Sequence, residues 1–154
     1  MRVTLAEAIH LLKQGQVVAI PTETVYGLAG DASNEDALHK IYATKQRPAN
    51  NPLIVHLADI AHVSAWASEF SPLAQKIAQA FWPGPLTLVL PAKPEVSHIV
   101  RAGEPTVALR VPAHPLARQL LIESGMGLAA PSANKYTQLS PTTAEHVESS
   151  LGAS

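Results

Sequence analysis

The sequence contains no cysteine among its 154 residues. Disulfide bonds, thiol nucleophiles and cysteine-based zinc sites are therefore excluded. Lysine and arginine, 11 together, nearly balance aspartate and glutamate, 12 together, and the formal net charge is -1. A strongly basic nucleic-acid-binding module would show an excess of positive charge, so this composition leaves room only for a local basic cleft.

Long apolar runs are also lacking. No stretch approaches the ~20 apolar residues that span a bilayer. Glu7, His10 and Lys13 interrupt the N-terminal segment, so we expect neither a signal peptide nor a membrane anchor. Hydrophobic residues make up 47% and charged residues 15% of the chain, which is a globular composition. With this length, the composition predicts one cytoplasmic domain.

The motifs that usually identify nucleotide or metal sites are absent. The chain has no G-x-x-x-x-G-K-[ST] loop and no G-x-G-x-x-G fingerprint. It has no H-E-x-x-H motif, no G-x-S-x-G elbow, and no cluster of histidines and carboxylates at metal-ligand spacing. We therefore expect no dedicated metal site and assign no catalytic residue.

Helical and extended patterns alternate along the chain. Thr4 and Glu7 form a capping box ahead of an amphipathic helix, and Ser33 or Asn34 caps a second helix, which must end before Pro48. Further helices are expected at 71–81, 114–124 and 140–151, and strands at 17–20, 52–57, 86–90, 106–111 and 127–131. This alternation predicts an α/β domain with a mixed, twisted, open sheet flanked by helices.

Polar side chains gather near the ends of these expected strands. The segment "PTETVYG" follows the first strand without a break, and "APSAN" follows the last. Lys45 and Arg47 either complement the negative end of the second helix or bind phosphate. His56, near the end of "PLIVHL", is either a structural histidine or a ligand of the cleft.

Arg110 lies between apolar residues in the strand "TVALRVP". A charge there is costly unless it is paired, so Arg110 either bonds a carboxylate such as Glu23 or Asp31, or faces a polar cleft. Strand alternation places Thr106 on the same face as Arg110. Because ligands of open α/β sheets bind at strand ends, these groups predict a cleft for a small anionic ligand.

Five segments, taken together, resemble one family. They are "PTETVYGLAGDA", "KQRPANNPLIVHL", "WPGPLTLVL", "VALRVPAHPLARQLL" and "APSAN…SPTTAEHV", in this order. From about residue 5 to its C-terminal end, the chain resembles the YrdC-type family of threonylcarbamoyl-AMP synthases. The resemblance implies a YrdC/RibB-like fold with a concave, positively charged cleft. It also implies an enzyme that condenses L-threonine, bicarbonate and ATP into threonylcarbamoyladenylate and releases pyrophosphate.

The resemblance further implies roles for particular residues. The L-threonine-binding positions are Thr24, His56, Arg110 and Ala130. The ATP-binding positions are Lys45, Arg47, Asn51, Thr106, Ser132, Asn134 and Ser140. Many relatives carry lysine where this chain has Asn51, which would weaken ATP binding here unless Lys45 compensates. Mg²⁺ is implied to arrive with ATP, and catalysis to come from positioning and from neutralising phosphate charge.

Partners and domain limits follow from the same resemblance. A downstream complex would transfer the threonylcarbamoyl group to tRNA, and contact with tRNA or RNA is a further expectation. Family members continue past the helix at 140–151 with more strands, so we expect one YrdC-like domain over residues 1–154 that is incomplete at its C-terminus. Three alternatives stay open. The first is a non-catalytic RNA- or nucleotide-binding module of this fold, and the second is a carbamoyl-adenylate-forming relative like the domain of hydrogenase maturation proteins. The third is a catalytically inactive fragment whose strands serve only to pack.

Overall fold

The computed structural model describes residues 4–21, 26–45 and 53–131. Its helices are α1 (Leu5–Lys13), α2 (Glu35–Lys45), the 3₁₀ helix η1 (Ile60–Ala65), α3 (Pro72–Phe81) and α4 (Pro115–Ser124). Its strands are β1 (Val18–Pro21), β2 (Tyr26–Asp31), β3 (Ile54–His56), β4 (Leu88–Pro91), β5 (Thr106–Arg110) and β6 (Leu128–Ala130). The helix expected at 140–151 lies outside the described residues.

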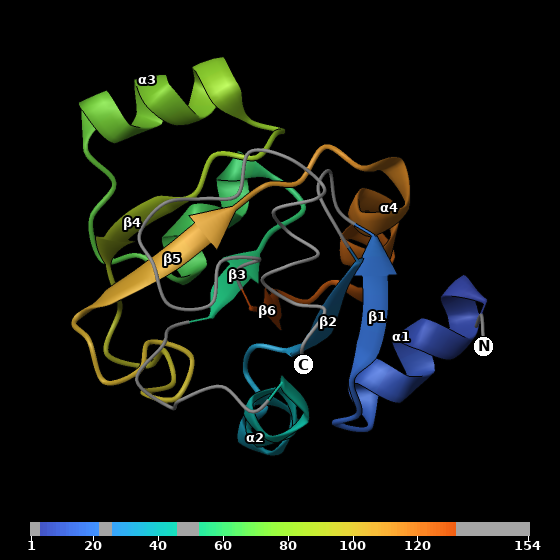
Figure 1. Cartoon of the computed structure of the whole chain (residues 1–154). Coiled ribbons are helices and arrows are strands. Elements are labelled where there is room, and N and C mark those ends of the chain that lie inside the picture. The colour runs from blue at the N-terminus through green and yellow to red at the C-terminus, as the bar shows by residue number, and fades with distance from the viewer. Residues whose placement is uncertain (1–3, 22–25, 46–52, 132–154) are drawn as a thin grey trace.

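The six described strands form one mixed sheet in the order β1-β2-β6-β3-β5-β4. β3 and β5 pair in parallel, and the other described pairs are antiparallel. In Figure 1, β1 and α1 lie at one side of the molecule and β4 and α3 at the other. The predicted fold class, an α/β domain with a mixed open sheet, is confirmed.

Two hydrophobic clusters assign the helices to the two faces of the sheet. Helices α1 and α4 pack on one face, through Ala8, Leu12, Leu120 and Leu121 against strand residues that include Ala29, Leu128 and Ala130. Helix α2 and η1 pack on the opposite face, where Val55, Leu109 and Ala129 point. The face that receives α1 and α4 is called the α1/α4 face below.

Capping residues explain why the predicted helices begin where they do. Thr4 and Glu7 form the capping box of α1, and the Ser71 side chain accepts a hydrogen bond from Ala74 N at the start of α3. Asn34 Oδ1 accepts a bond from Ala37 N, which decides the alternative left open for α2. Gly125 ends α4 in the left-handed conformation. Neither β2 nor η1 was predicted.

Candidate functional site

His56 and Arg110 meet at one end of the sheet. They are the last residues of the two parallel strands β3 and β5, and the register makes them direct partners. Leu128, on the other side of β3, is also a partner of His56. Partners in a sheet share a face, and Leu128 packs with α1 and α4, so all three side chains lie on the α1/α4 face.

Two more predicted site residues lie on the same face. Ala130 pairs with Ile54, and Ile54 pairs with Ala108. Ile54 and Ala108 each lie two residues before His56 and Arg110, so their side chains point to the same face. Thr106 continues this face at the opposite end of β5. At the usual strand rise, Thr106 and Arg110 are about 13 Å apart. The site residues thus define two ends of the face, called here the Arg110 end and the Thr106 end.

His56 is buried, with 2% of its surface exposed. Its Nδ1 lies 3.3 Å from the carbonyl oxygen of Leu128. A carbonyl oxygen can only accept a hydrogen bond, so this contact requires the proton on Nδ1 and fixes the orientation of the ring. His56 therefore has a structural role, because its ring bonds the backbone of β6. This bond uses only Nδ1, so it does not exclude a role of the ring in ligand binding.

Arg110 is also buried, with 8% of its surface exposed. Its Nε donates a hydrogen bond of 3.0 Å to the carbonyl oxygen of Gly84, in the turn after α3. Gly84 N in turn donates to Val111 O at 2.8 Å, so the turn is fastened to the end of β5 at two points. Asp31, one of the two proposed carboxylate partners, lies three strands away and accepts from Ser33 N instead.

The remaining predicted site residues lie outside the described residues or at their edge. Thr24, Arg47, Asn51, Ser132, Asn134 and Ser140 lie outside the described residues, as does Glu23. Lys45 is the last residue of α2, and only its backbone is described. The structure therefore places His56, Arg110, Ala130 and Thr106 on one face, and the binding roles of all the site residues stay predictions.

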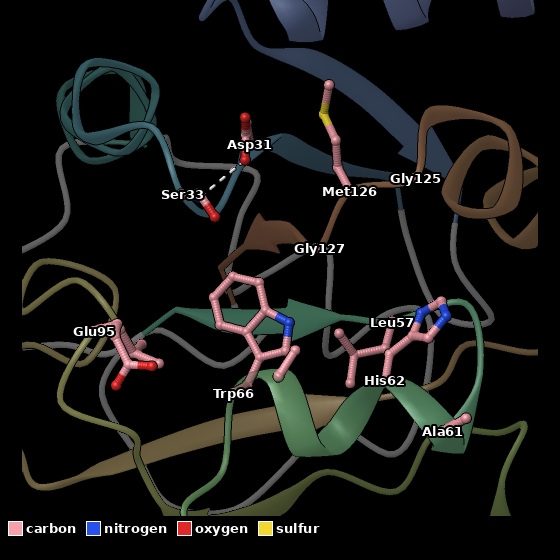
Figure 2. Close-up of a pocket in the computed structure, with 12 residues that line it drawn as sticks. Asp31, Ser33, Leu57, Ala61, His62, Trp66, Glu95, Gly125, Met126 and Gly127 are labelled. Atoms are coloured by element: carbon pink, nitrogen blue, oxygen red, sulfur yellow. Dashed lines mark hydrogen bonds between the residues drawn. The ribbon is translucent and has the colours of Figure 1, made fainter.

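A separate cavity of about 620 Å³ lies near the opposite face of the sheet (Figure 2). Among the described residues, its lining includes Asp31, His62, Trp66 and Glu95, and it includes none of His56, Thr106, Arg110 and Ala130. The Trp66 ring lies against Gly127, where an added Cβ would come within 2.5 Å of the indole. Trp66 and Gly127, two of its lining residues, therefore pack closely just before β6, and the described lining does not include His56 or Arg110.

Comparison with known proteins now places the chain. The model of the Sua5/YciO/YrdC family, described as "Telomere recombination", matches residues 10–154. The chain belongs to this family. A curated threonylcarbamoyl-AMP synthase of Bacillus subtilis is 52% identical over 96% of this chain and 43% of its own length. One from Vibrio vulnificus is 40% identical over 97% of this chain and 81% of its own length.

Solved structures of this family have the same fold. The crystal structure of Pyrococcus abyssi Sua5 complexed with L-threonine is 43% identical to this chain, with a TM-score of 0.82. That match covers 97% of this chain and 45% of Sua5. The chain thus spans less than half the length of several of its most similar relatives. A full-length HypF structure, 19% identical with a TM-score of 0.73, shares the fold.

Neither a metal-binding cluster nor a membrane-spanning helix occurs among the described residues. No group of three or more histidine, cysteine, aspartate or glutamate side chains in this part of the chain could hold a metal ion. None of the described helices is long and apolar enough to cross a membrane.

Proposed function

We propose that the chain forms L-threonylcarbamoyladenylate from L-threonine, bicarbonate and ATP and releases pyrophosphate. The observation that carries this proposal is the pairing of His56 with Arg110 at one end of the α1/α4 face. Both occupy positions at which the family resemblance implies threonine binding. The 52% identity with a curated synthase over nearly the whole chain supports the same activity.

Arg110 is proposed to bind the carboxylate of threonine, since a guanidinium matches a carboxylate in shape and charge. The bond from Arg110 Nε to Gly84 O helps to orient the guanidinium. His56, the strand partner of Arg110, is held by Leu128 O. Together with Thr24 and Ala130, it is proposed to complete the threonine site at the Arg110 end. Held in this way, threonine would present its amine toward the middle of the face.

The reaction then needs two bond-forming steps. The uncharged amine of threonine attacks the carbon of bicarbonate, a C–N bond forms, and water leaves to give a carbamate. A carbamate oxygen next attacks the α-phosphorus of ATP, and the P–O bond to pyrophosphate breaks as pyrophosphate leaves. Neither step requires a protein nucleophile, so the contribution of the protein is to align the reactants and to neutralise phosphate charge.

ATP is proposed to lie toward the Thr106 end, with Mg²⁺ bound to it as part of the substrate. Its contacts would come from Lys45, Arg47, Asn51, Thr106, Ser132, Asn134 and Ser140. The product would pass to a tRNA-modifying complex in the cytoplasm, and tRNA itself is a further proposed contact. These partners rest on the family resemblance.

Pyrophosphate release tests the proposal. The protein would be assayed with ATP, Mg²⁺ and bicarbonate, with and without L-threonine, and with L-serine or carbamoyl phosphate in place of threonine. Threonine-dependent release is expected. Arg110→Gln should raise the KM for threonine by about 10- to 100-fold, because a hydrogen-bonded charge pair is lost. Release that needs no threonine, or that carbamoyl phosphate supports alone, would contradict the proposal.

A further inference from the structure

A buried arginine outside the predicted site holds one loop in shape. Arg101 has 8% of its surface exposed and lies in the loop between β4 and β5. Its Nε and Nη2 donate to Val96 O at 3.2 and 3.1 Å, and its Nη1 donates to Glu104 O at 2.6 Å. Its Nη2 also lies 3.2 Å from His98 Nδ1. One guanidinium thus joins both ends of the segment 96–104.

The charge of Arg101 makes this arrangement unusual. Within the part of the chain that the structure describes, its recorded partners are two backbone carbonyls and an imidazole, and no carboxylate pairs with it. A buried cation without a counter-charge is costly, so apolar packing would be the cheaper way to close a loop. Apolar packing is not directional, whereas the planar fork of the guanidinium fixes the distance and orientation of the carbonyl groups that it joins.

The same loop is fastened to the elements that lead to the proposed nucleotide contacts. Tyr42, one helical turn before Lys45, donates from its hydroxyl to Ile99 O at 3.1 Å. Leu53 N, just after the segment 46–52 that contains Arg47 and Asn51, donates to Val100 O at 3.1 Å. At its far end the loop runs through Glu104 into Thr106 at the start of β5.

We propose that Arg101 is a positioning residue for the nucleotide end of the site. By clamping residues 96–104, it sets the relative positions of α2, the start of β3 and the start of β5. The threonine end is fastened differently, since Leu57 N bonds Arg110 O at 2.8 Å and Arg110 Nε bonds Gly84 O. The assignment of the two ends to ATP and threonine rests on the proposed function, whereas the clamp itself does not.

The test compares Arg101→Met and Arg101→Lys with two controls. Lys76→Met removes the same charge from the exposed face of α3, and Gly125→Ala strains a left-handed residue far along the chain from this loop. Arg101→Met should weaken ATP binding by about tenfold, because small displacements of positioning groups have large effects. The affinity for L-threonine should change less than about twofold. Arg101→Lys should recover part of the ATP affinity, and both controls should retain it.

Amide hydrogen exchange provides a readout that needs no substrate. In Arg101→Met, the Leu53 amide, which bonds the clamped loop, should exchange at least about tenfold faster. The Leu57 amide, at the other end of the same strand, should keep its rate. Equal acceleration at both amides, or equal loss of ATP and threonine affinity, would mean that Arg101 only stabilises the fold and would overturn the proposal. If the unmodified protein bound neither ligand, the proposed function would fail, while the exchange rates would still decide whether Arg101 positions this loop.

Discussion

Replacing Gly84 with alanine should weaken threonine binding through its effect on Arg110. A Cβ added at Gly84 would lie 2.5 Å from Phe81 O, whereas real Cβ contacts essentially never fall below 3.0 Å. The turn must therefore move by at least about 0.5 Å, at a cost of about 1–3 kcal/mol in stability. The Gly84 carbonyl that orients the Arg110 guanidinium, now 3.0 Å from Nε, would move with it.

The size of the functional effect follows from that hydrogen bond. A shift of about 0.5 Å away from Nε lengthens the bond to about 3.5 Å, which is beyond the normal range. Hydrogen bonds to charged groups contribute about 1.5–3 kcal/mol, and every 1.4 kcal/mol is a factor of ten. The KM for threonine should therefore rise about tenfold, with little change in the KM for ATP.

Gly125→Ala is the matched control for this variant. Gly125 has a φ of +68°, and an added Cβ would meet no atom within 4 Å, so the cost is backbone strain alone. That strain is about 1–2 kcal/mol, similar to the cost at Gly84. Urea unfolding would measure both stabilities, and pyrophosphate release at varied threonine would measure KM. If Gly84→Ala lost stability but kept the KM of Gly125→Ala, the turn would not orient Arg110 and the reasoning would be refuted.

Three further predictions concern the fold. Leu109 is fully buried, so Leu109→Ala should lower the free energy of unfolding by about 2–5 kcal/mol, and an unchanged urea midpoint would contradict this. The backbone N–H and then the hydroxyl of Thr4 lower the pKa of Glu7 from its ordinary value of 4.5. The resulting stabilisation is present above that value and is lost as the pH falls through the lowered pKa, so the advantage over Glu7→Gln in thermal melts should vanish in acid. Gly127→Ala should displace the Trp66 ring and shift tryptophan fluorescence, since the new Cβ would lie 2.5 Å from the ring.

Local signals in the sequence were sufficient for most of the elements. Capping residues and helical spacing predicted the start of α1 and both limits of α3 and α4 within about one residue, because these signals act within one or two turns. Strand β2 was not predicted, since Tyr26–Asp31 contains two glycines and lacks a clear alternation. Its pairing with β1 and β6 is a tertiary effect that no local pattern encodes.

The candidate site was predictable only in part for the same reason. Alternation along one strand placed Thr106 and Arg110 on one face, but the register of β5 against β3, which brings Arg110 beside His56, depends on pairing between distant segments. Arg101 was overlooked because a single arginine in a loop has no periodic signal. Its role depends on carbonyl groups of its own loop, and only coordinates reveal where these point.

Detection of the product tests the central claim most directly. The protein would be incubated with L-threonine, ATP, Mg²⁺ and ¹³C-labelled bicarbonate, and the mixture analysed by mass spectrometry alongside Arg110→Gln. The account predicts an adenylate that contains threonine and the labelled carbon, with much less of it from the variant at limiting threonine. Release of pyrophosphate without such a product, or equal yields from both proteins, would contradict the assignment of Arg110 to threonine in this reaction.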